Sequence, residues 1–182
     1  MPVHSIRLRT RHVRLPADTV TPVGLYLRLR DQYPGCLLLE SSDYHTQQNA
    51  FSYLACHELA RFELRGADLL ERLPDGAEYR TTLADPRRQA MDYLREFASW
   101  FEAPPTEQPF ITGGLFGYWG YGAAQYCEDV RFREDKPVAG PLPDVRYGLY
   151  RYVLAINHFR QELHIFEHTP ETTDPDDAAL DR

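Results

Sequence analysis

In Leu37-Leu38-Leu39-Glu40-Ser41-Ser42, an apolar run ends abruptly in a carboxylate and two hydroxyls. A short continuous apolar run is typical of a strand that is buried on both faces, so we expect a central strand over residues 36–40. A second informative stretch, residues 113–121, interleaves glycine with aromatic residues. It predicts a strand over residues 110–120, with glycines that allow close backbone packing, followed by a short helix or turn over residues 121–128.

The remaining sequence predicts more strands than helices. Strands are expected over residues 3–15, 51–57, 61–65, 146–157 and 161–168. Thr19 or Thr21 offers an N-cap before Pro22, which predicts a helix over residues 22–31. Asp85-Pro86 starts the clearest helix, which has an apolar stripe and must end by Pro104. Because strands predominate and occur in sequential pairs, the predicted class is α+β, a largely antiparallel sheet with a few flanking helices.

Charge and hydropathy exclude several classes of partner. The net charge of −7 provides no field that attracts phosphates, so nucleic acid is not expected as a partner. Arginines near the N-terminus alternate with apolar residues and are interpreted as the solvent face of a strand. No apolar run has transmembrane length, and no signal peptide precedes the first strand, so we expect a soluble, cytoplasmic domain without membrane contact.

The sequence offers little catalytic chemistry. His164 and His168 have metal-ligand spacing only on a helix, but their neighbours predict a strand, where their side chains would lie about 13 Å apart. We therefore expect no metal site there, since zinc needs three or four converging ligands. The three cysteines form no CxxC pair, and Cys36 and Cys56 lie in apolar runs, where we expect them to be buried. No nucleophile–base pair is apparent, so no catalytic residue is assigned.

Glu40 and Ser41 are the strongest candidates for a ligand site. They would stand at the end of a rigid strand, where a carboxylate suits an ammonium group and a hydroxyl can donate and accept hydrogen bonds. In the alternative interpretation, Glu40 pairs with one of the many arginines and Ser41 caps a turn. From the residues alone, both interpretations remain open.

Four motifs, in this order, resemble the N-terminal region of anthranilate synthase component I. They are Thr21-Pro22-Val23, Leu38-Leu39-Glu40-Ser41, Gly113-Gly114-Leu115-Phe116-Gly117-Tyr118 and Tyr147-Gly148-Leu149-Tyr150. The resemblance covers most of residues 15–168. It implies an N-terminal regulatory domain over residues 1–168. Residues 169–182, which lack periodicity, would then be a linker toward a C-terminal chorismate-binding portion that this chain does not contain.

The resemblance also implies a function. Members of that family convert chorismate to anthranilate and bind tryptophan as a feedback inhibitor. By motif position, Glu40 would pair with the tryptophan ammonium, Ser41 would hydrogen-bond to the ligand, and Pro22 would form part of the wall. Some members have a lysine about ten residues after the serine, whereas this chain has Phe51 in that stretch, so its tryptophan sensitivity is expected to differ.

The catalytic machinery of the family lies in the C-terminal portion, which binds Mg²⁺ and chorismate. The present chain alone is therefore expected to be an inactive fragment without a cofactor. Its expected partners are tryptophan, its own C-terminal portion and a glutamine amidotransferase subunit. The large subunit of aminodeoxychorismate synthase, in the folate pathway, is the main alternative. A stand-alone amino-acid-binding module and a scaffold that docks the amidotransferase are two further alternatives.

Overall fold

The structure is a computed structural model that describes residues 5–40, 50–128, 130 and 142–171. The chain divides into two compact units, here named after their helices. The α1 unit comprises Ile6–Glu58, Glu102–Gly114 and Tyr150–Arg182, and the α2 unit comprises Met1–Ser5, Leu59–Phe101 and Leu115–Leu149. Two long strands, β3 (Phe51–Arg65) and β8 (Val145–Asn157), run through both units.

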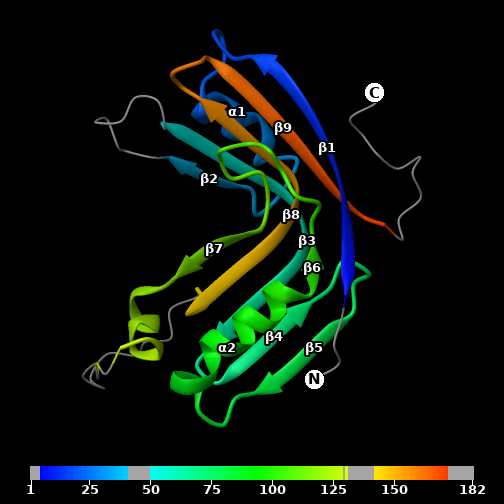
Figure 1. The fold of residues 1–182 in the computed structure, drawn as a ribbon. Helices are drawn as coiled ribbons and strands as arrows, with labels where there is room; N and C mark the ends of the chain where they lie inside the picture. Colours follow the sequence, from blue (N-terminus) through cyan, green and yellow to red (C-terminus); the bar gives the residue numbers. More distant parts are fainter. Residues whose placement is uncertain (1–4, 41–49, 129, 131–141, 172–182) are drawn as a thin grey trace. The chain divides into compact units, whose positions relative to one another are not determined.

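The α1 unit is an antiparallel arrangement of strands with one helix (Figure 1). Its own elements are β1 (Ile6–Pro16), α1 (Pro22–Leu29), β2 (Leu37–Glu40) and β9 (Glu162–Pro170). β2 pairs with β3, and β9 pairs with both β8 and β1. The core lies between these strands and α1, and includes Leu54, Ile156 and Leu163 from the strands and Leu25 and Leu29 from the helix.

Local chemistry explains where α1 begins. The Thr21 side chain accepts a hydrogen bond from the Gly24 amide at 3.1 Å, which satisfies one of the free amides of the first turn. Pro22 occupies the first helical position, where its missing N–H costs nothing. This confirms the predicted start of the helix, although α1 ends at Leu29, two residues earlier than predicted.

The α2 unit packs its helix on a second set of antiparallel strands (Figure 1). It contains β4 (Asp68–Arg72), β5 (Glu78–Thr82), α2 (Pro86–Ser99), β7 (Leu115–Trp119) and the 3₁₀ helix η2 (Tyr121–Tyr126). The short strand β6 (Phe101–Glu102) spans the boundary between the units in the sequence. Asp85 caps α2 through the Arg87 amide, as predicted, and Phe97 from α2 packs on Phe62 with ring centroids 5.7 Å apart.

The α+β class with a mostly antiparallel sheet is confirmed, as are the strands β1, β8 and β9 and the short helix η2. The predicted burial of residues 36–40 on both faces is wrong. Cys36 is buried, but β2 pairs only with β3 among the described strands, and Leu39 is 41% exposed. The apolar run over residues 36–40 therefore has a different cause from the predicted one. Cys36, before the strand, is buried, and the described residues cover only one face of β2.

Two further strand predictions need correction, and two strands had no prediction. The separate strands predicted over residues 51–57 and 61–65 are one strand, β3, in which His57 has a positive φ of 62°. Strands β4 and β5 were not predicted, because their alternation is interrupted by charged residues. The strand predicted over residues 110–120 is confined to β7, since Gly114 has a φ of 117° and ends the extended backbone.

Glycine does serve close packing in this stretch, as predicted. A Cβ atom on Gly117 would collide with the backbone of Arg146 and Tyr147 on the paired strand β8. On Gly113, a Cβ atom would lie 2.7 Å from His168 Nε2. The glycines of this stretch therefore allow two close contacts: the backbone of β8 lies against Gly117 in the α2 unit, and the His168 ring lies against Gly113 in the α1 unit.

Candidate functional site

The structure places two of the three predicted effector residues. Pro22 is the first residue of α1, and Glu40 is the last residue of β2, where it is exposed. Helix α1 contacts β2, so both residues belong to one packed helix–strand pair. Ser41 lies outside the described residues.

Strand register determines which face of the sheet carries Glu40. Glu40 stands opposite Ser52, and Leu38 stands opposite Leu54. Directly opposite residues of an antiparallel pair share a face, and Leu38 and Leu54 both belong to the core that α1 covers. Glu40 therefore lies on the α1 face of the sheet, whereas the side chain of Phe51, one residue before Ser52, projects from the other face.

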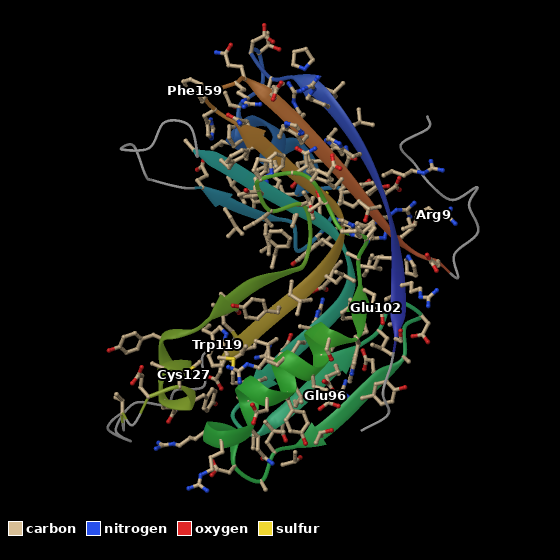
Figure 2. All side chains as sticks on the ribbon, viewed as in Figure 1. Arg9, Glu96, Glu102, Trp119, Cys127 and Phe159 are labelled. Carbon is tan, nitrogen blue, oxygen red and sulfur yellow. The ribbon has the colours of Figure 1, made fainter. Side chains whose placement is uncertain are left out.

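That other face contains a cavity of about 510 Å³, within the size range of small-molecule sites. Residues from β1, β3, β8, β9, the β8–β9 turn and the segment before β7 line it, among them His12, Arg14, Phe51, Phe110, Phe159, Arg160, Glu162 and His164. Figure 2 shows Phe159 in the β8–β9 turn, and its side chain is 56% exposed. Glu40 and the cavity thus occupy the two faces of the sheet at the same end of the β2–β3 pair.

A chain of polar contacts crosses one wall of the cavity. His12 Nε2 lies 3.0 Å from His164 Nδ1, His164 Nε2 lies 3.5 Å from Glu162 Oε2, and Arg14 Nη1 lies 3.4 Å from Glu162 Oε1. Burial lowers the pKa of His12, and the neighbouring His164 and Arg14 lower it further. A neutral His12 can donate from Nε2 to His164 Nδ1, and His164 Nε2 faces the Glu162 carboxylate, so the three groups form one connected polar chain.

Aromatic rings form the apolar part of the lining. Phe110 stacks on Phe51 with centroids 4.8 Å apart and meets the His164 ring edge-on at 4.9 Å. Such surfaces suit a flat ring, and the arginines and Glu162 supply charges of both signs. The cavity is consequently suited to binding a small molecule that has an aromatic portion and charged groups.

His168 fixes the segment that closes one side of this cavity. Its Nδ1 atom lies 2.9 Å from Thr10 Oγ1, and its Nε2 donates to the Thr112 carbonyl at 3.0 Å. The ring is buried, and burial lowers the pKa of His168. A neutral ring with one donor and one acceptor matches these two partners, so His168 joins residues 110–114 to β1.

Sequence reasoning did not identify this cavity. The alternation of His12 with Arg14 on β1, and of Glu162 with His164 on β9, places each pair on one face of its strand. What the sequence lacked was the register: Arg14 stands opposite His164, and this pairing joins residues 150 positions apart. The prediction that His164 and His168 lie on a strand is confirmed.

Within the described ranges, no group of three or more His, Cys, Asp or Glu side chains is placed to hold a metal ion. None of the helices in the same ranges is long and apolar enough to cross a membrane.

Sequence comparison relates the chain to known enzymes. It is 31% identical to anthranilate synthase component 1 from Acinetobacter calcoaceticus over 164 residues, which are 87% of this chain and 31% of the relative. The corresponding protein from Thermus thermophilus is also 31% identical, over 87% of this chain and 32% of the relative. This chain is a homologue of anthranilate synthase component I. It spans about a third of the length of the relatives it matches.

Two other comparisons complete this result. Aminodeoxychorismate synthase component 1 from Klebsiella aerogenes is 27% identical over 74% of the chain and 29% of its own length. The fold of this chain is similar to that in the crystal structure of anthranilate synthase component I from Streptococcus pneumoniae TIGR4, with a TM-score of 0.50 and 22% sequence identity. The match covers 90% of this chain and 33% of the crystallised chain. No family profile matches the chain.

Proposed function

We propose that this chain is the N-terminal, effector-binding part of an anthranilate synthase component I that acts in the cytoplasm. The observation that carries the proposal is the 31% identity to two such proteins along 87% of the chain. The whole protein would convert chorismate to anthranilate in tryptophan biosynthesis. Residues 1–168 would form the regulatory part and residues 169–182 would lead toward a chorismate-binding portion, which would bind Mg²⁺.

L-Tryptophan is the proposed effector, bound at the end of β2. The Glu40 carboxylate would pair with the ligand ammonium, Ser41 would hydrogen-bond to the ligand, and Pro22 would contribute to the wall. The exposure of Glu40 and the contact between α1 and β2 support this assignment. The cavity lined by Phe51 and Phe110 lies on the opposite face of the sheet from Glu40, so it is not part of this effector site.

Calorimetric titration of the purified chain with L-tryptophan tests the assignment. Loss of a charge-assisted hydrogen bond costs about 1.5–3 kcal/mol, so Glu40→Gln is expected to weaken binding by roughly 10- to 100-fold. Glu78→Gln is the matched control, since Glu78 is an exposed residue at the start of β5 in the α2 unit. Equal affinity of wild type and Glu40→Gln would overturn the role of Glu40, and absence of heat with wild type would overturn the effector site.

A glutamine amidotransferase subunit is the proposed supplier of ammonia to the whole protein. Aminodeoxychorismate synthase is the second candidate, favoured by the 27% identity to the Klebsiella aerogenes protein. The product formed from chorismate by the intact protein separates the two enzymes. A stand-alone amino-acid-binding module would bind tryptophan without any activity on chorismate, and a scaffold would bind the amidotransferase while Glu40→Gln had no effect.

A further inference from the structure

Two cysteines that are far apart in the sequence meet at the start of β2. The register of β2 and β3 places Leu37 opposite Ala55, and continuing it by one residue beyond the start of β2 brings Cys36 opposite Cys56. Both belong to the core cluster under α1, with exposed fractions of 7% and 1%. Both are free cysteines, and the Cys36 thiol donates to the Leu37 carbonyl at 3.9 Å.

The strand geometry is compatible with a covalent bond between them. Facing residues of an antiparallel pair have Cα atoms about 4.5–5.5 Å apart. A disulfide requires a Cα separation of about 4.4–6.8 Å, so the whole range of facing pairs falls within it. We propose that Cys36 and Cys56 are a site of reversible oxidation, at which hydrogen peroxide forms a cross-strand disulfide between β2 and β3.

The environment of the two thiols indicates which sulfur reacts first. The side-chain interaction with Cys56 lowers the pKa of Cys36, although burial opposes this, whereas the same interaction, burial and the charge of Cys36 raise the pKa of Cys56. These directions favour Cys36 as the sulfur that reacts first, and Cys36 is also the more exposed of the pair. Cys56 is positioned as the thiol that resolves the intermediate.

The reaction balances in two steps. The Cys36 sulfur attacks one oxygen of hydrogen peroxide, the O–O bond breaks, and Cys36 becomes a sulfenic acid while the leaving hydroxide takes a proton to become water. The Cys56 sulfur then attacks the Cys36 sulfur, the S–O bond breaks, and the S–S bond forms. The Cys56 proton leaves with the second hydroxide as water, so two thiols and one peroxide give one disulfide and two waters.

The disulfide would attach the start of β2 to β3 and close a ring through residues 37–55, which include Glu40. Closing such a ring restricts the unfolded chain, so the oxidised protein is expected to unfold at a higher urea concentration than the reduced protein. A dithiol reductant would reverse this shift.

Peptide mapping provides a direct test, because trypsin leaves both cysteines in one peptide, residues 31–61, and Cys127 in another. The folded chain is treated with hydrogen peroxide, denatured, alkylated with iodoacetamide and digested. The expected result is a 31–61 peptide that is two hydrogen atoms lighter and carries no alkyl group. Recovery of that peptide with both cysteines alkylated would overturn the proposal.

Three variants make the test specific. Cys127→Ser is the control and is expected to give the same oxidised peptide, because Cys127 is exposed and lies beyond η2 (Figure 2). Cys56→Ser is expected to leave a sulfenic acid on Cys36 that dimedone traps, and Cys36→Ser is expected to remove the reaction. Equal trapping at Cys56 in the Cys36→Ser protein would contradict the assigned order of the two sulfurs.

Discussion

Replacing Glu71 by glutamine is expected to remove a strong pH dependence from the stability of this protein. Glu71 lies on β4 with an exposed fraction of 2%, opposite Phe62 on β3. Its Oε1 atom has no hydrogen-bond partner among the described residues. Burial, and secondly the charge of Glu96 on α2, raise the pKa of Glu71 from an ordinary value of 4.5 to about 7.

The sign of the effect follows from the direction of this shift. The folded state holds the proton of Glu71 more tightly than the unfolded state does, so protonation favours folding. The advantage is complete below pH 4.5 and is lost as the pH rises toward 7. One pKa unit corresponds to about 1.4 kcal/mol, so ionisation of Glu71 lowers the free energy of unfolding by up to about 3 kcal/mol. Roughly 1 kcal/mol of this appears by pH 5 and nearly all of it by pH 8.

Urea denaturation of wild type and Glu71→Gln at several pH values measures this contribution. Between about pH 5 and pH 8, wild type is expected to lose roughly 2–3 kcal/mol relative to the variant. Burying the neutral amide has its own cost, but that cost does not vary with pH and leaves the slope unchanged. A difference between the two proteins that stays constant across this range would refute the assignment of a buried, protonated Glu71.

Four other substitutions have expected outcomes. Gly117→Ala should destabilise the chain by about 3 kcal/mol or more in urea denaturation, because the new Cβ collides with β8 backbone. Gly66→Ala, where a Cβ meets nothing within 4 Å but φ is +58°, should cost only about 1 kcal/mol, and similar losses for the two would contradict the packing argument. Asp85→Ala should cost about 1 kcal/mol through loss of the α2 cap, seen as a lower denaturation midpoint, whereas no change would contradict that role. Ser41→Phe in the intact enzyme should relieve tryptophan inhibition while preserving activity, and unchanged inhibition would count against the proposed effector site.

Local chemistry explains which parts of the fold could be predicted from the sequence. Thr21-Pro22 and Asp85-Pro86 each combine an N-cap with a first-turn proline, and both helices begin where these pairs predict. Strands β8 and β9 could be predicted because two segments rich in apolar residues are joined by a short polar connection around His158. The burial of Cys36 and Cys56 was also predicted, and the structure confirms it.

Properties that depend on strand pairing could not be predicted. The burial of a strand depends on which elements cover its faces and edges. The apolar run that ends at Glu40 is compatible both with a central strand and with a strand that has one described partner, so it could not decide between them. The cavity depends on β1 lying beside β9, and the thiol pair depends on β2 lying beside β3. The β1–β9 pairing joins the two ends of the sheet in sequence, and in both pairs the sequence gives no local signal for the register.

An assay of the intact protein with chorismate, ammonia and Mg²⁺ decides whether the proposed enzyme is correct. Anthranilate is fluorescent, so its formation and its suppression by added L-tryptophan can be followed in one experiment. We expect anthranilate to form and L-tryptophan to inhibit the reaction. Formation of aminodeoxychorismate, or anthranilate formation that L-tryptophan leaves unchanged at all concentrations, would contradict the assignment of this chain as a tryptophan-responsive part of anthranilate synthase.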